Sequence, residues 1–126
     1  MTTNLEINAI SPTEKQLEAF LALPDQPVVM VNLLKFKAGG GAEEYAKYGA
    51  GIQPCLAKVG ARLLFAGRAV SCLVGNGDWD MVALMEYPNP RALLEMVQTA
   101  EYQAAHAHRA AGLEGQVNYA VIQAAP

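Results

Sequence analysis

The sequence predicts one α+β domain built on a four-stranded sheet. Its 126 residues are the length of a single domain. Hydrophobic residues make up 52% of the chain and charged residues 17%, so it can bury a core. Segments of strand and helix character alternate along it, and no internal repeat is visible. We expect a single domain over 1–126, with a helical extension over 1–26 and a core over 27–124.

The charge and composition argue against several classes of partner. Nine Lys and Arg stand against twelve Asp and Glu, a net charge of −3, which argues against a nucleic-acid binder. No apolar run has the roughly eighteen residues of a membrane span, and the polar N-terminus carries no signal peptide. Cys55 and Cys72 form neither a disulfide framework nor a metal-ligand pattern, so we expect inert buried thiols. The expected protein is cytoplasmic and has no metal or cofactor.

The first part of the chain predicts a helix followed by a buried strand. Ser11 is the expected N-cap, Pro12 the first helical residue and Glu14 the capping-box partner. This helix covers Pro12–Leu23. The next segment, Val28–Phe36, is almost continuously apolar. Such a run is typical of a strand that is buried on both faces.

A second helix, over Glu43–Val59, follows a glycine triplet. Its apolar residues recur every three or four positions and define a buried stripe, namely Tyr45, Tyr48, Ile52, Leu56 and Val59. The triplet Gly39-Gly40-Gly41 could cradle a phosphate at the helix start. However, no Lys-Ser or Lys-Thr pair follows it, and Glu43-Glu44 would repel an anion. We expect the triplet to be a flexible linker.

A long β-hairpin is expected next. Its strands cover Ala61–Val74 and Asp78–Tyr87, and the turn between them is Gly75-Asn76-Gly77, whose residues tolerate positive φ. Gly67 indicates a bulge or bend in the first of these strands. The second strand is apolar at both alternating sets of positions, which again predicts a strand with no wet face.

Two further helices and a strand complete the chain. Asn89 caps a helix that begins at Pro90. Thr99 caps a second piece over Ala100–Ala111, and Gln116–Gln123 is the last strand. After the leading helix, the order is therefore β-α-β-β-α-β, the split pattern of a ferredoxin-like sandwich.

In that topology the helices cover one face of the sheet and leave the other open. Open faces of antiparallel sheets usually carry alternating polar residues. Here apolar residues point to both faces, Val29, Val31 and Leu33 to one and Met30, Leu34 and Phe36 to the other. The open face is thus a larger apolar patch than monomers normally expose. A second copy of the chain would cover it, and the leading helix is the competing cover.

Three segments together resemble the DUF1330 family of bacterial proteins. They are Pro27–Phe36, Trp79–Pro88, and Glu101-Tyr102-Gln103 with Arg109, within a match that spans roughly Pro27 to Leu113. The resemblance implies the dimeric α+β barrel superfamily, in which two ferredoxin-like units close their sheets into a shared barrel. It implies a homodimer and no settled activity.

The strongest polar constellation consists of Tyr102, His106 and Arg109. Their spacing of i, i+4 and i+7 places them on one helix face. A histidine can act as a general base near neutral pH, and an arginine can clamp a carboxylate or enolate in bidentate fashion. The alternative is a solvated helix face, with a snorkelling arginine and a tyrosine whose hydroxyl stays in water. His108 lies off this face and is expected to be exposed.

Asn32 is a ligand-binding candidate on the first strand. It is the one polar residue in an apolar stretch and shares a face with Met30, so its amide either holds a ligand or is satisfied inside the core. A second resemblance, to haem-degrading monooxygenases of the same superfamily, rests on Asn32, Tyr102 and His106. The resemblance fails at Tyr87, because those enzymes have a tryptophan near the end of the third strand and this chain has a tyrosine. This departure argues against His106 as a haem ligand.

Two carboxylates, Asp80 and Glu86, are further ligand-binding candidates. They lie on one face of their strand, six residues apart. That separation is about 20 Å, which is too far for one shared acid–base site. Each therefore stands alone. For Asp80 the alternative is an ion pair with Arg62 or Arg68 on the neighbouring strand.

We expect a homodimer that binds a small, partly apolar organic molecule between sheet and helices. If the protein is an enzyme, the superfamily implies cofactor-independent oxygenation, isomerisation or lyase chemistry. His106 would then take a proton and Arg109 would hold the oxyanion. The rival interpretation is a non-catalytic dimer, with a barrel interior filled by Met30, Leu34, Met81 and Met85.

Overall fold

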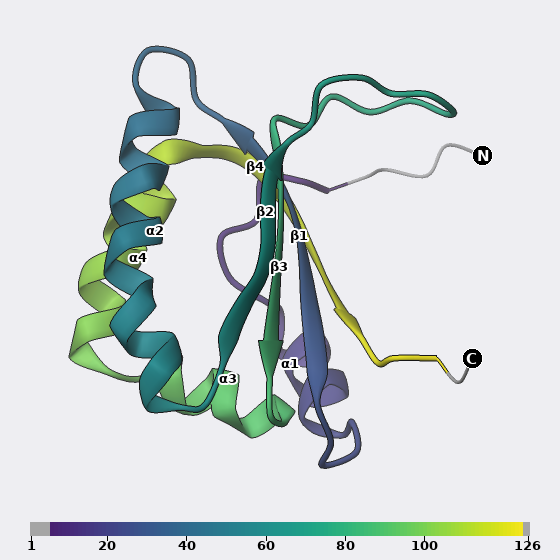
Figure 1. Cartoon of the computed structure of the whole chain (residues 1–126), viewed down its shortest axis with the longest axis vertical. Helices are drawn as coiled ribbons and strands as arrows, with labels where there is room; N and C mark the ends of the chain where they lie inside the picture. The colour runs from purple at the N-terminus through teal and green to yellow at the C-terminus, as the bar shows by residue number, and fades with distance from the viewer. Residues whose placement is uncertain (1–5, 125–126) are drawn as a thin grey trace.

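A computed structural model of the chain describes residues 6–124 and has four helices and one four-stranded sheet (Figure 1). The elements in order are α1 (Glu14–Leu21), β1 (Val28–Phe36), α2 (Gly41–Lys58), β2 (Arg62–Arg68), β3 (Met81–Tyr87), α3 (Pro90–Val97), α4 (Ala100–Gly112) and β4 (Leu113–Val121). The strands lie in the order β2-β3-β1-β4, and every neighbouring pair is antiparallel. This order confirms the predicted ferredoxin-like α+β fold.

Side-chain caps determine where the helices begin. The first helix begins at Glu14, two residues later than expected, because Thr13 and not Ser11 is its N-cap. The Gln16 N–H donates to Thr13 Oγ1 at 3.1 Å, and the Thr13 N–H donates to Gln16 Oε1 at 2.9 Å. This reciprocal pair is a capping box with glutamine, not Glu14, as its second member. The caps predicted at Asn89 and Thr99 are confirmed.

The β-hairpin is shorter than the sequence predicts. Pairing between β2 and β3 ends at Arg68 and Met81, so residues 69–80 form a loop, which we call the arm. The arm extends away from the sheet on the side opposite α2 and α4 (Figure 1). Two glycines at its tip, Gly75 and Gly77, adopt φ values of 85° and 133°. The expected turn is present, but the strands stop short of it.

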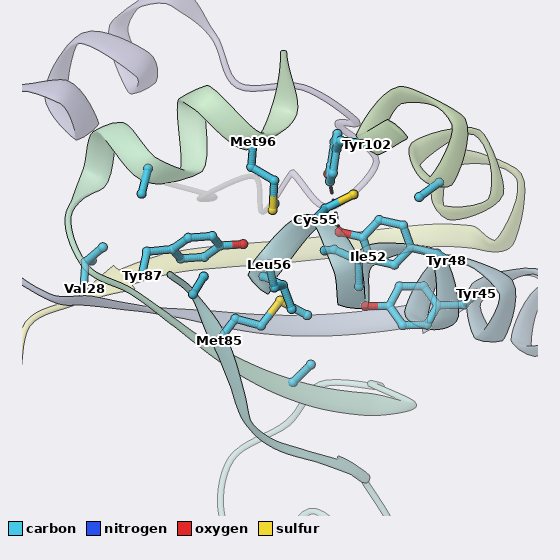
Figure 2. Packing of buried hydrophobic residues seen from close by; sticks show 14 of the residues in the cluster. Val28, Tyr45, Tyr48, Ile52, Cys55, Leu56, Met85, Tyr87, Met96 and Tyr102 are labelled. Carbon is cyan, nitrogen blue, oxygen red and sulfur yellow. Dashed lines mark hydrogen bonds between the residues drawn. The ribbon is translucent and has the colours of Figure 1, made fainter. Parts of the chain in front are cut away.

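The main core lies between the sheet and the helices. Its largest fully buried side chains are Leu34, Ile52, Met96 and Val28. Figure 2 shows Val28, Ile52 and Met96 together with the aromatic residues of this core. The predicted stripe of α2 is buried except at Val59, which is half-buried. Met30, Leu34, Met81 and Met85 all belong to this core. The prediction that these four fill the interior of a barrel between two sheets is therefore wrong.

The opposite face of the sheet is open. It carries the half-buried side chains Val29, Val31 and Leu33 of β1 and Val82 and Leu84 of β3. On the outer strands, Phe65 is 58% exposed and Tyr119 is 65% exposed. The leading helix does not cover this face, because no residue of α1 is buried and α1 lies at the end of the sheet, near α3 (Figure 1). We call these seven residues the open face.

Two glycines hold α2 and α4 together. A Cβ on Gly41 would lie 2.7 Å from the Gly112 carbonyl oxygen, and a Cβ on Gly112 would lie 2.6 Å from the Gly41 carbonyl oxygen. The Lys37 N–H also donates to Gly112 O at 2.8 Å. The last residue of the glycine triplet is thus buried in a close backbone crossing, and its prediction as part of a flexible linker is wrong.

Candidate functional site

A buried arginine stands at the centre of the candidate site. Arg109 of α4 is 6% exposed, and its Nη2 donates to Gln116 Oε1 at 2.6 Å and to Asn32 Oδ1 at 3.3 Å. Its guanidinium carbon lies 5.1 Å from the centre of the Tyr48 ring and 5.9 Å from that of Tyr45. Within residues 6–124, no carboxylate pairs with this guanidinium. The predicted alternative, a snorkelling arginine on a solvated face, is wrong.

Asn32 connects the sheet to this arginine. It is 5% exposed, and its Nδ2 donates to the Ala83 carbonyl at 3.2 Å and to the Met30 carbonyl at 3.3 Å. Both amide protons are therefore satisfied by backbone, which holds the side chain in one orientation. Its Oδ1 faces Arg109 as a fixed acceptor.

Tyr45, Tyr48 and Tyr102 form a row of aromatic rings in the core (Figure 2), and Arg109 lies against the first two of them. Ring centres lie 5.3 Å apart for Tyr45 and Tyr48 and 6.1 Å apart for Tyr48 and Tyr102. The Tyr48 and Tyr102 hydroxyl oxygens are 3.4 Å apart. Burial raises the pKa of Tyr45 to about 12 and also raises the pKa of Tyr102. Both hydroxyls are therefore neutral at physiological pH and able to donate. The buried Tyr45 hydroxyl has no partner within residues 6–124.

His106 lies one turn before Arg109 on α4. Its ring centre is 5.8 Å from that of Tyr102, and its Nδ1 is buried without a partner among the described residues. Burial, followed by the positive charge of Arg109, lowers the pKa of His106 below its usual value. The imidazole is consequently neutral at pH 7 and can accept a proton.

The lowered pKa of His106 predicts a pH-dependent stability. Because the unfolded chain binds a proton at this residue more readily than the folded chain, the free energy of unfolding should fall as pH drops below about 6.5. His106→Gln is expected to flatten the curve below about pH 6.5, measured by urea unfolding followed by circular dichroism. An unchanged slope in His106→Gln would contradict the assignment.

The remaining predicted residues lie outside this cluster. Asp80 precedes β3, and its Oδ2 accepts the Phe36 N–H at 2.8 Å. The ion pair with Arg62 belongs instead to Glu86, whose Oε1 is 3.1 Å from the Arg62 Nε. The pairing expected for Asp80 is therefore wrong, because the β2–β3 register sets Arg62 opposite Glu86. His108, which was expected to be exposed, is half-buried, and its Nδ1 lies 2.8 Å from Glu44 Oε2.

Three residues of the cluster, Gln116, Tyr45 and Tyr48, are not among the predicted site residues. Tyr45 and Tyr48 belong to the core as expected, and both also present their rings to Arg109. Gln116 was placed at the start of the last strand, but β4 already begins at Leu113. Its register opposite Leu34 turns it toward the helices. Gln116 could have been recognised as a candidate because it is a polar residue at a strand position that pairs with the buried Leu34. Cys72 also differs from the prediction, since it is exposed while Cys55 is buried.

Two hollows on the described surface lie away from this cluster. One, of about 630 Å³, lies at the start of α2 between Gly40, Lys37 and Arg68. The other, of about 340 Å³, lies at the base of the arm. Within residues 6–124, no three His, Cys, Asp or Glu side chains gather as ligands of a metal ion would. No helix in the same range has the length and hydropathy needed to cross a bilayer.

Solved structures with this fold include one protein of 29% sequence identity and several of less than 20%. The RPA0582 protein of unknown function from Rhodopseudomonas palustris is 29% identical, with a TM-score of 0.85 over 93% of this chain and 98% of its own. A dimeric protein of unknown function and ferredoxin-like fold from Bacteroides fragilis is 16% identical, with a TM-score of 0.58 over 75% of this chain and 94% of its own. A dimeric ferredoxin-like protein of unknown function from Thermobifida fusca is 12% identical, with a TM-score of 0.56 over 82% of this chain and 96% of its own.

No curated protein sequence matches the chain. The family model described as "Domain of unknown function (DUF1330)" matches residues 39–123. This match extends from the glycine triplet before α2 to the end of β4 and includes Tyr48, Arg109 and Gln116. The chain therefore belongs to the DUF1330 family.

Proposed function

We propose that the chain acts as a homodimer that binds a small organic anion between its sheet and helices. The observation that carries the proposal is the buried guanidinium of Arg109, which faces only neutral partners within residues 6–124. Removing an unpaired cation from water costs several kcal/mol. Amide oxygens recover part of this cost, and a carboxylate or enolate would recover more because its hydrogen bonds are charge-assisted.

The surroundings of Arg109 support a ligand with an apolar body and a polar end. Tyr45, Tyr48 and Tyr102 offer ring surfaces, which suit a planar apolar group. The Tyr45 hydroxyl and His106 Nδ1 are buried and without partners. Buried polar atoms in native proteins are nearly always hydrogen-bonded, so each of these two atoms could take up a polar group of a ligand.

Benzoate tests this proposal, and benzamide is its neutral counterpart. Benzoate is expected to bind the wild-type protein in calorimetric titration and to raise its melting temperature, whereas benzamide should do neither at the same concentration. Arg109→Met should weaken benzoate binding at least about tenfold because a charge-assisted contact is worth roughly 1.5–3 kcal/mol. Arg91→Met on α3, where the arginine is exposed, is the control and should bind normally. The anion site would be refuted if the wild type bound benzoate and benzamide equally well, or if Arg109→Met bound benzoate as tightly as the wild type does.

The homodimer is supported by the open face. Its central residues, Val31, Leu33 and Leu84, remain partly exposed in the single chain. A contiguous apolar patch of this kind marks an interaction surface, and twofold pairing would cover both copies at once. The relatives from Bacteroides fragilis and Thermobifida fusca are described as dimeric. Pairing of two open faces would produce the shared barrel that the resemblance implies.

A catalytic role is the second candidate, and the neutral His106 favours it. A base one helical turn from a guanidinium can remove a proton while the arginine stabilises the resulting enolate. This arrangement suits cofactor-independent oxygenation or isomerisation of an activated ring or enol. His106→Gln separates the two candidates, because it should abolish proton transfer and leave the charge that binds the anion in place.

A further inference from the structure

The arm places apolar side chains in water. Val70, Leu73 and Val74 are 80%, 95% and 87% exposed. The nine residues from Ala69 to Gly77 include no charged side chain. Exposed loops are normally polar, and this loop extends on the side of the open face, away from α2 and α4 (Figure 1). The arm therefore has the composition of a contact surface.

The arm and the open face form one continuous surface. The hollow at the base of the arm, about 340 Å³, is lined by Leu33 and Val82 of the open face and by Val70, Cys72 and Trp79 from the arm or its base. A body that covers the open face near Leu33 consequently reaches the arm as well. The absence of charge between Ala69 and Gly77 favours an apolar protein surface over a nucleic acid or an anionic membrane surface, both of which require basic residues.

We propose that the arm of each protomer packs against the second copy of the chain and clasps it. This inference rests on the proposed homodimer and adds a distinct contact to it. In a twofold dimer, the open face of each copy is covered by the open face of the other. Because each arm adjoins the open face of its own chain, it then lies next to the partner that covers this face. Leu73 and Val74 make the clasp, and Trp79 at the base of the arm is buried when it closes.

Sedimentation over a dilution series tests the clasp. Leu73→Ser combined with Val74→Ser removes two side chains that are almost fully exposed, so folding should be unaffected. The dimer dissociation constant is expected to rise tenfold or more, because each protomer loses two apolar contacts. Leu73→Met is the matched control, since it retains the apolar surface, and it should dimerise like the wild type.

The emission of Trp79, the one tryptophan of the chain, provides a second measurement. Emission should shift to longer wavelength as the wild-type dimer dissociates on dilution, because Trp79 then becomes more exposed to water. If the wild type dimerises but the double serine variant dimerises equally well, the clasp is wrong and the homodimer stands. The same conclusion follows if emission stays constant through dissociation, since the arm then contacts its own chain or solvent. A wild type that is monomeric throughout overturns both proposals.

Discussion

Leu84→Asp is expected to convert the proposed homodimer into a folded monomer. Leu84 lies near the centre of the open face, directly opposite Val31 on β1 and Phe65 on β2. In a face-to-face dimer, an aspartate here would be buried without a cationic partner. Such a carboxylate costs several kcal/mol in each copy, so the dissociation constant should rise by about a thousandfold or more.

Sedimentation velocity measures this outcome. A protein concentration of about ten micromolar suits the affinities of specific interfaces. The wild type should sediment at twice 13.4 kDa and the variant at 13.4 kDa, with unchanged far-ultraviolet circular dichroism. Ala46→Asp, which adds the same charge at an exposed position of α2, is the control and should remain dimeric. A dimeric Leu84→Asp protein would show that another surface holds the two copies together.

Gly112→Ala is expected to destabilise the chain by about 3 kcal/mol. The added methyl would meet the Gly41 carbonyl oxygen at 2.6 Å and the Tyr45 backbone nitrogen at 3.0 Å. Both atoms belong to the backbone of α2 and cannot rotate away, so the two helices must separate. This contact also sets the distance between α4 and α2, and therefore between Arg109 and the Tyr45 and Tyr48 rings.

Gly49→Ala on α2 is the matched control because nothing lies within 4 Å of the added carbon. Alanine is the better helix former, so this variant should gain about 0.5–1 kcal/mol. Urea unfolding followed by circular dichroism measures both changes, and their signs should be opposite. If Gly112→Ala were as stable as the wild type, the close crossing of α2 and α4 would not constrain the site.

Local patterns in the sequence were sufficient for most of the fold. The helical stripe that includes Tyr45 and Ile52 predicted the buried side of α2, and the caps at Asn89 and Thr99 predicted the starts of α3 and α4. These features depend on neighbours within a few residues, where propensity and hydrogen bonding act directly. The start of the first helix was predicted two residues too early because two capping residues, Ser11 and Thr13, stand close together there, and Thr13, paired reciprocally with Gln16, is the one that caps the helix.

The hairpin could not be predicted in full from local patterns. Alternating apolar residues from Ala61 to Val74 predict a strand wherever a partner strand is available. In the fold, pairing stops at Arg68 and Met81, and the apolar residues beyond become the arm. A sequence pattern shows which residues avoid water, but the covering surface can belong to a separate chain.

Short-range spacing in the chain was enough to predict the α+β class, the order of the elements and the helix face that carries Tyr102, His106 and Arg109. The folded arrangement was needed to see that Arg109 is buried among neutral partners, that Asn32 and Gln116 reach it from two strands, and that Asp80 and Glu86 serve other contacts. Those results depend on sheet register and on the crossing of α2 over α4. Both arise from contacts between residues far apart in the chain, where spacing carries no information.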